Sequence, residues 1–193
     1  MSNRSFSLIP FPAPNLLEIS ITGEILLQNS VITLHYSLVG KIDEIFFSKP
    51  VADPARKDEL WKSTCFEFFL AIKDMPQYWE FNMSPSGDWN VYHMDAYRRI
   101  GFREETLIQQ LQFETQQAAN QFTLDTAVDL KPVIQKAQIL EVGITAIVQT
   151  HEGNETYWAL THPAPQADFH SRESFVLVLG EHTRLSQQSA LGG

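Results

Sequence analysis

The sequence has little cysteine, little positive charge and no long apolar run. Its single cysteine, Cys65, excludes an intramolecular disulfide and is typical of a reducing compartment, where a lone thiol is more often a small buried residue than a nucleophile. Fourteen Lys and Arg stand against 23 Asp and Glu, for a formal net charge of −9 at pH 7. A phosphate backbone needs clustered cations, and adjacent basic residues such as Arg98-Arg99 are rare here. We therefore expect no nucleic-acid partner.

Membrane and export signals are also lacking. No apolar segment approaches the length of a membrane span, and Pro10, Pro12 and Pro14 interrupt the region where a secretory signal needs a continuous apolar stretch. These absences predict a cytoplasmic protein with no membrane partner. We expect one domain over residues 1–185, followed by a disordered polar tail over 186–193, and the sequence leaves a homo-oligomer open.

Aromatic residues are plentiful and lie in strand-like segments. The chain holds 13 Phe, five Tyr and four Trp. Alternating or apolar strand patterns occur twice within 16–39, and again at 63–72, 78–83, 89–94, 121–128, 139–150, 156–161 and 175–179. With about eight to ten strands and little helix, the pattern predicts an all-β fold, an antiparallel two-sheet sandwich of immunoglobulin-like or jelly-roll type.

The clearest local signal is a β-hairpin over residues 78–94. Pro85-Ser86-Gly87 forms a three-residue loop that places Gly87 where a left-handed backbone is needed. The resulting register sets Met83 opposite Trp89, Phe81 opposite Val91, and Trp79 opposite His93. One face of the hairpin is then apolar and belongs to the core.

The opposite face of this hairpin is polar and carries Glu80, Asn82, Asn90 and Tyr92. Carboxylate, amide and phenol groups in a row suit a ligand rich in hydroxyls. They also suit a solvated face, which is the ordinary state of one side of an antiparallel sheet. The hairpin alone leaves both readings open and favours the solvated one.

The strand over 63–72 places a carboxylate among apolar neighbours. Glu67 shares its face with Cys65 and Phe69, so we expect it to be buried. An unpaired buried carboxylate is costly, which predicts a cationic or hydrogen-bond-donating partner or a functional site. Arg172 is the expected partner.

Two tryptophans stand next to polar loops at strand ends. Trp61 and Trp158 could stack on the two faces of a sugar ring, or each could plug an open end of the sandwich. Both readings stay open from the pattern alone.

The loop after Trp158 is dense in polar residues but matches no standard metal spacing. His162, Asp168 and His170 have donor types suited to zinc, although a proline-containing loop separates them. We expect an ordered loop in which Asp168 caps backbone amides, while His170 and Arg172 bind carbonyls or Glu67. No esterase elbow, phosphate loop, dinucleotide fingerprint or H-E-x-x-H motif is present, which predicts no catalytic site.

Four segments taken together resemble DOMON-like proteins related to family 9 carbohydrate-binding modules. They are Trp61-Lys-Ser-Thr-Cys-Phe-Glu67, the 78–89 segment, Tyr157-Trp158-Ala-Leu-Thr-His162 and Asp168-Phe-His170-Ser-Arg172. The resemblance covers nearly all of residues 5–180 and implies the sandwich fold and a non-catalytic sugar-binding groove with an aromatic clamp. It implies Trp61 and Trp158 as the clamp, with Glu67, Glu80 and Asn82 as polar partners. We add Asn90 and Tyr92 as candidates from the same polar face, and the ligand is a small molecule or an oligosaccharide.

The resemblance also leaves cofactor alternatives. Secreted modules of this kind bind calcium, for which no oxygen cluster can be assigned here. DOMON-related domains can hold haem b between Met and His, and Met83 with His162 is the candidate pair. A small enzyme on the same scaffold is the remaining alternative.

Overall fold

The computed structural model describes residues 2–14, 16–97, 100–134 and 138–180. The expected tail over 186–193 lies outside the described residues. Strands make up nearly all of the regular structure, joined by 3-10 turns at Ile42–Glu44, Leu60–Lys62 and Arg172–Ser174. The strands are β1 (Ser2–Pro10), β2 (Ile19–Gln28), β3 (Val31–Gly40), β4 (Cys65–Ile72), β5 (Tyr78–Met83), β6 (Trp89–Met94), β7 (Arg103–Glu104), β8 (Phe113–Gln117), β9 (Gln121–Asp129), β10 (Leu140–Gln149), β11 (Glu155–Ala159) and β12 (Leu177–Leu179).

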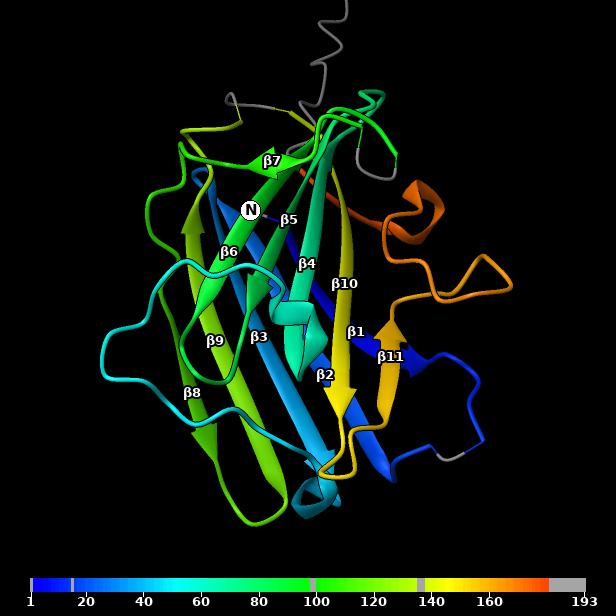
Figure 1. Cartoon of the computed structure of the whole chain (residues 1–193). Helices are drawn as coiled ribbons and strands as arrows, with labels where there is room; N and C mark the ends of the chain where they lie inside the picture. The colour runs from blue at the N-terminus through cyan, green and yellow to red at the C-terminus, as the bar shows by residue number, and fades with distance from the viewer. Residues whose placement is uncertain (1, 15, 98–99, 135–137, 181–193) are drawn as a thin grey trace, which may run out of the picture.

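These strands form one curled antiparallel sheet in the order β7-β6-β5-β4-β10-β11-β1-β2-β3-β9-β8, with β12 beside β10. The sheet is continuous because β1 belongs to both of its halves. Its residues Ser2–Leu8 pair with β2, whereas Ile9 and Pro10 pair with β11. The curl brings a front layer of β4, β5, β6 and β10 over a back layer of β1, β2, β3 and β9 (Figure 1).

The core lies between the two layers. Phe66, Phe68 and Leu70 of β4 face it with no exposed surface. Tyr36 of β3 reaches across the core, and its hydroxyl donates a 2.6 Å hydrogen bond to the backbone carbonyl of Glu67. Apolar burial of this extent supplies most of the driving force that holds the layers together.

The predicted all-β antiparallel architecture is confirmed, with a difference in detail. The structure has one curled sheet of twelve strands among its described residues, where two sheets and eight to ten strands were expected. The sequence analysis made no strand prediction for residues 2–10, which form β1. Pro10 ends the strand at the junction between the two halves.

The hairpin prediction is confirmed residue by residue. Met83 pairs with Trp89, Phe81 with Val91, and Trp79 with His93. Gly87 has φ +95°, in the left-handed region that the loop requires. The register therefore fixes the polar row of this hairpin on the outer side of the front layer.

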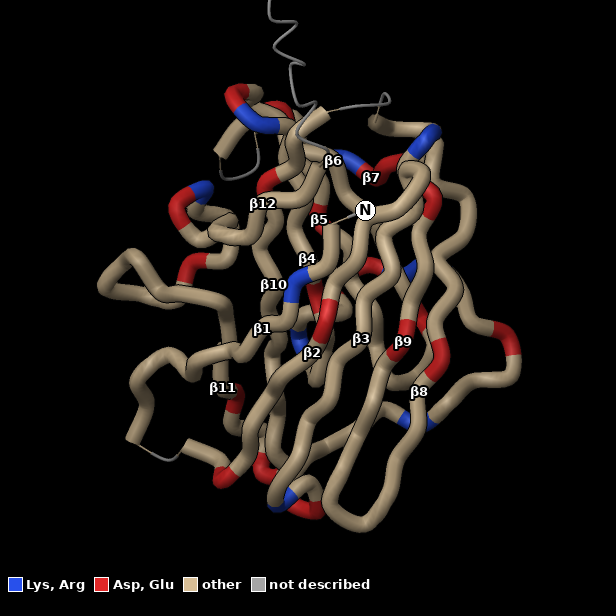
Figure 2. The backbone as a smooth tube through the Cα atoms, turned by 180° about the vertical axis from the view of Figure 1, so that it is seen from behind, with Lys and Arg blue, Asp and Glu red and all other residues tan. Residues whose placement is uncertain are grey.

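The two outer surfaces of the sheet differ in cover. The connecting segment around residues 46–64 runs in front of the front layer, and the segment around 160–176 lies beside β10 and β11 (Figure 1). The back layer carries acidic residues on β2, β8 and β9 (Figure 2). Among the described residues, no helix is both long and apolar enough to cross a bilayer.

Candidate functional site

A cavity of about 250 Å³ lies on the outer side of the front layer. Glu67 and Phe69 of β4 and Glu80 of β5 form its floor, since all three point away from the core. Ile147 of β10 and Tyr157 of β11 line it on one side, and Trp61 and Phe102 come from the connecting segments. The residues 167–170 complete its wall.

The floor holds two carboxyl groups on neighbouring strands. Glu67 is 2% exposed and Glu80 is 5% exposed. The hydroxyl of Thr145 on β10 donates to Glu67 Oε2 at 3.1 Å, and Asn82 Nδ2 donates to Glu80 Oε1 at 2.8 Å. Burial, followed by the nearby charge of Glu80, raises the pKa of the Glu67 carboxyl well above its usual range.

One flank of the cavity is a group of three aromatic rings. Trp61 lies in the 3-10 turn just before β4 and meets Tyr92 of β6 edge to face, with ring centroids 5.7 Å apart. The Phe102 ring stacks on the Tyr92 ring, with ring centroids 4.8 Å apart. Tyr92 is buried beneath them, so Trp61 and Phe102 are the rings presented to the cavity.

The opposite flank, across β4 and β10, combines rings with polar groups. Tyr157 and Phe169 meet edge to face with centroids 6.1 Å apart. Asp168 Oδ1 accepts the backbone N–H of His170 at 3.1 Å, which confirms the predicted capping role of this aspartate. The hydroxyl of Tyr78 lies 3.0 Å from His170 Nδ1, which anchors the loop to β5.

Behind the floor, the polar row of the hairpin is buried and hydrogen bonded. Asn82 and Asn90 have no exposed surface, and Tyr92 is 1% exposed. Asn90 Nδ2 donates to the Tyr92 hydroxyl at 2.9 Å, and that hydroxyl donates to Asp58 Oδ1 at 2.8 Å. The favoured solvated reading of this face is therefore wrong, because connecting segments cover it.

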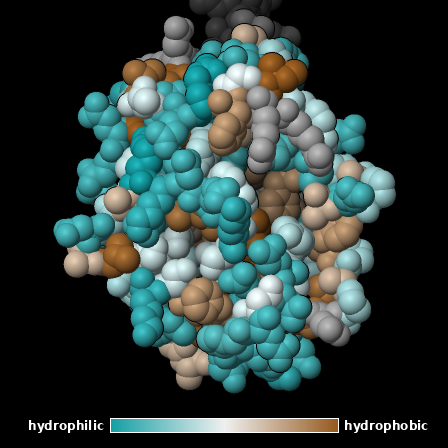
Figure 3. Space-filling model, in the orientation of Figure 1, coloured by the Kyte–Doolittle hydropathy of each residue, from teal (hydrophilic) through white to brown (hydrophobic). Residues whose placement is uncertain are grey.

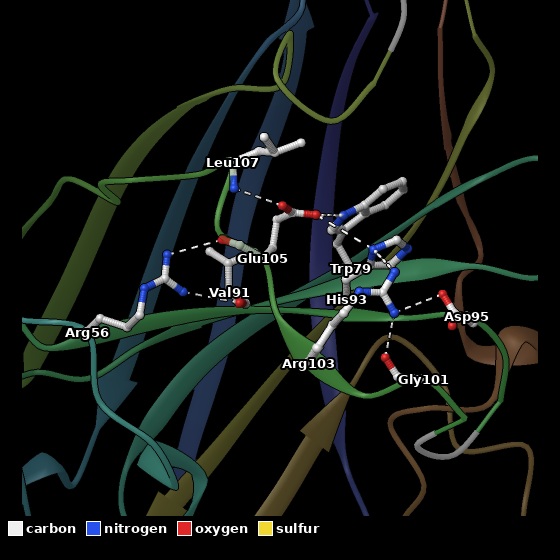
Figure 4. Close-up of polar contacts among 9 residues, drawn as sticks. All are labelled: Arg56, Trp79, Val91, His93, Asp95, Gly101, Arg103, Glu105 and Leu107. Atoms are coloured by element: carbon white, nitrogen blue, oxygen red, sulfur yellow. Dashed lines mark hydrogen bonds and ion pairs between the residues drawn. The ribbon is translucent and has the colours of Figure 1, made fainter.

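Arg56 fixes one of these covering segments to the hairpin edge. Its guanidinium donates to Asn90 Oδ1 at 2.7 Å and to the backbone carbonyls of Val91, Glu105 and Ile108. It also lies 4.4 Å from the ring centroid of Trp89. Figure 4 shows the Arg56 guanidinium between the backbone carbonyl groups of Val91 and Glu105.

A second polar cluster lies at the same edge, next to β7. Buried Glu105 accepts Trp79 Nε1 at 3.0 Å and the backbone N–H of Leu107 at 2.9 Å (Figure 4). Arg103 donates to His93 Nδ1 at 2.9 Å, and burial followed by this positive charge lowers the pKa of His93. The hydrogen bonds of Glu105 secure the segment after β7, whereas His93 Nε2 is buried with no hydrogen-bond partner among the described residues.

The structure brings together five of the residues singled out in the sequence. Trp61, Glu67, Glu80, Asp168 and His170 line one cavity. Asn82, Asn90 and Tyr92 support it from beneath and do not line it.

The expected pairing of Trp61 with Trp158 is corrected. Trp158 is 3% exposed within the core, where its Nε1 donates to the Thr156 hydroxyl at 3.0 Å. Alternation along β11 turns its neighbour Tyr157 to the cavity instead. Trp158 is therefore a core residue, and the pair does not flank one space.

The expected partner of Glu67 is also corrected. Arg172 hydrogen bonds to Glu141, at the beginning of β10, and to the backbone carbonyl of Met75. The burial of Glu67 and its hydrogen-bond donor are confirmed, but the donor is Thr145.

The candidate haem ligands are not brought together in a cavity. Met83 is buried in the core with no exposed surface, while His162 Nε2 lies 3.0 Å from the Ile9 carbonyl and its ring packs on Phe11. Within the described ranges, no group of three or more His, Cys, Asp or Glu residues could hold a metal ion.

Several lining residues escaped the sequence reading. Period-two alternation in β11 could have separated Tyr157 from Trp158, because neighbouring strand residues face opposite sides. Phe102 and Phe169 come from irregular segments, in which no periodic pattern indicates direction. Figure 3 shows that this face of the molecule has a recessed area with hydrophobic atoms bordered by hydrophilic residues.

Comparisons with known proteins show the fold. No protein-family model matches the chain, and no curated protein matches it either. A candidate carbohydrate-binding protein from Bacteroides uniformis matches with a TM-score of 0.63 and 11% identity, over 89% of this chain and 83% of that chain.

Two structures of a family 9 carbohydrate-binding module from Caldicellulosiruptor kristjanssonii are also similar. The complex with glucose has a TM-score of 0.56 and 8% identity, over 90% of this chain and 83% of that chain. The complex with cellotriose has a TM-score of 0.55 and 10% identity, over 88% and 78%. These neighbours support the relation to family 9 modules at the level of the fold, while the relation to DOMON-like proteins stays a prediction.

Proposed function

We propose that this chain is a non-catalytic carbohydrate-binding domain that holds a sugar in the cavity on the outer side of its front layer. One observation carries the proposal: aromatic rings flank a floor that contains two buried carboxyl groups. Trp61 and Phe102 on one flank, with Tyr157 and Phe169 on the other, replace the Trp61–Trp158 clamp expected from the sequence.

The chemistry of this cavity fits a sugar ring. A pyranose has C–H faces that pack on aromatic rings and an edge of hydroxyl groups that need acceptors. Glu67 and Glu80 offer carboxyl oxygens at the floor, between the two aromatic flanks. A volume of about 250 Å³ suits one sugar ring, so we expect a monosaccharide or the end of a chain.

The structural neighbours support this proposal by analogy. The family 9 module from Caldicellulosiruptor kristjanssonii forms complexes with glucose and with cellotriose. Glucose and cellotriose are therefore the first ligands to test.

A second candidate function is glycoside hydrolysis. Glycosidases use two carboxyl groups, one of which is an acid with a raised pKa. Glu67 and Glu80 supply two carboxyl groups in the floor of the cavity, and the pKa of Glu67 is raised. Incubation of the protein with cellotriose, followed by chromatography of the products, separates the candidates: unchanged cellotriose that binds supports a binding domain, and glucose release supports an enzyme.

Calorimetric titration of glucose and cellotriose into the purified protein tests the proposal. Trp61→Ala removes a large contact surface, and we expect it to weaken binding by about 30-fold or more while the circular dichroism spectrum stays unchanged. Val39→Ala, an exposed position on β3, is the control and should bind as the wild type does. Equal affinity in Trp61→Ala and the wild type would place the sugar elsewhere.

A further inference from the structure

The Glu67 side chain has an oxygen that the protein itself leaves without a partner. Thr145 donates to Oε2, whereas Oε1 is buried and has no hydrogen-bond partner among the described residues. A buried acceptor without a donor costs free energy, and a buried charge without a counter-charge costs more. Glu67 lines the cavity, so a ligand there is in a position to supply the missing donor.

The neighbouring Glu80 increases this cost. It lies diagonally across the β4–β5 pair, because Glu67 pairs with Asn82 and Glu80 pairs with Phe69. Two carboxylates this close repel each other, and burial adds to the penalty on their charged forms. Burial, followed by the charge of Glu80, raises the pKa of Glu67, which favours the protonated form of this carboxyl group in the protein by itself.

The flanking rings are suited to a cation as well as to a sugar face. Trp61, Phe102, Tyr157 and Phe169 all line the cavity. The negative face of an aromatic ring attracts an ammonium group, and the attraction is larger where water is excluded. A neutral hydroxyl offers no charge that would stabilise the carboxylate form of Glu67, whereas an ammonium group does.

We propose that the cavity selects a sugar with a protonated amino group, such as a 2-amino-2-deoxyhexose, and that Glu67 is the residue that selects it. This inference rests on the proposed sugar-binding function. The ammonium group donates to Glu67 and compensates its charge, while the ring packs between the aromatic flanks. Binding then releases the Glu67 proton to solvent, because the carboxylate is the form that pairs with the cation.

Calorimetric titration of the wild-type protein with D-glucosamine, N-acetyl-D-glucosamine and D-glucose tests this selection. N-acetylation keeps the ring and removes the charge, which makes it the matched comparison. At slightly acidic pH we expect glucosamine to bind about tenfold tighter than either neutral sugar, since charge-assisted hydrogen bonds are stronger than neutral ones. Repeating the titration in buffers of different ionisation enthalpy should reveal proton release with glucosamine and none with glucose.

The outcomes separate this inference from the proposed function. If glucose binds and glucosamine binds no tighter, the selection for an amine is wrong while sugar binding stands. If none of the three sugars nor cellotriose binds, both proposals fail. Tighter binding of glucosamine without proton release would also overturn the role given to Glu67.

Variants then assign the selection to one side chain. Glu67→Gln keeps the size of the side chain and removes its charge, so the ratio of glucosamine to glucose affinity should fall from about ten to about one. Glu114→Gln makes the same charge change on exposed β8 and should keep the wild-type ratio. A ratio near ten in Glu67→Gln contradicts the proposal. Should Glu67→Gln fail to fold, the proton-release measurement on the wild type remains decisive.

Discussion

The two outer faces of the curled sheet carry similar polar residues in opposite environments. On the back layer, Glu24, Thr33 and Asp125 are exposed, and His35 shares a 2.7 Å hydrogen bond with Asp125. These residues border a cavity of about 1330 Å³ that also reaches the 54–56 segment and Trp89. On the front layer, the corresponding outward residues, such as Asn90, are buried. The same strand alternation therefore produces a solvated face on the back layer and a buried polar row on the front layer. The two differ because connecting segments cover the front layer.

The covering segments differ from ordinary connections in composition. The segment before β4 contributes Trp61, the segment before β7 contributes Phe102, and the segment after β11 contributes Phe169. Short turns such as that at Gly87 and Gly153 contribute nothing comparable. Aromatic residues in long connections are therefore the feature that distinguishes the covered face from the open one.

The largest expected effect on stability comes from removing the anchor of a covering segment. Arg56→Ala leaves Asn90 Oδ1 and three backbone carbonyls without their charged donor. We expect the free energy of unfolding to fall by about 3 kcal/mol, because charge-assisted hydrogen bonds in partly buried positions are among the stronger ones. Urea denaturation followed by tryptophan fluorescence measures the change.

Arg103→Ala is the control for that measurement. Arg103 belongs to the same edge of the molecule, but its side chain is 49% exposed, and its contacts with Asp95, His93 and the Gly101 carbonyl are exposed ones. An exposed ion pair contributes under about 1 kcal/mol, so the loss should be correspondingly small. Equal losses in the two variants would show that Arg56 does not anchor the cover.

A smaller loss is expected within the covered polar row. Asn90→Ala removes a fully buried amide that contacts Arg56 and Tyr92, and we expect it to cost about 2 kcal/mol. On the open face, Gln121→Ala changes an exposed side chain and should stay within about 0.5 kcal/mol of the wild type. Chemical denaturation of the pair compares the two faces directly, and similar values would remove the contrast between them.

The sequence predicts the strands and their registers better than it predicts the site. Alternation and the Gly87 turn gave the hairpin pairs, and the apolar face of β4 identified Glu67 as buried, because both depend on neighbouring residues. The cover over Asn82 and Asn90, and the partner of Glu67, depend on segments far away in the chain. Trp158 was misplaced because a tryptophan beside a polar loop suits a binding role and a core role equally.

The pH dependence of stability gives the smallest of these contrasts. The folded-state pKa of Glu67 lies above its usual value of 4.5, so the folded chain binds more protons than the unfolded chain. The stability that the protonated Glu67 contributes to the folded chain is complete below about pH 4.5 and is lost as the pH rises through the folded-state pKa. The range from roughly pH 5 to 7 lies above the pKa of this glutamate in the unfolded chain. Over this range, the free energy of unfolding should fall less steeply for Glu67→Gln than for the wild type.

Glu114→Gln supplies the matched control on the open face. It removes one exposed carboxylate, and its stability should follow the wild-type pH profile. If the free energies of unfolding of the wild type and Glu67→Gln fall in parallel from roughly pH 5 to 7, the buried carboxyl pair does not govern the pH dependence of stability.

The most direct test of the account is a nuclear magnetic resonance titration of the ¹⁵N-labelled protein with glucose. The account predicts that the amide shifts concentrate on the covered face, around Trp61, Glu67, Glu80, Tyr157 and the 167–170 segment. Shifts that concentrate on β2, β3 and β9 instead would contradict it, because they would place the sugar on the open face of the sheet.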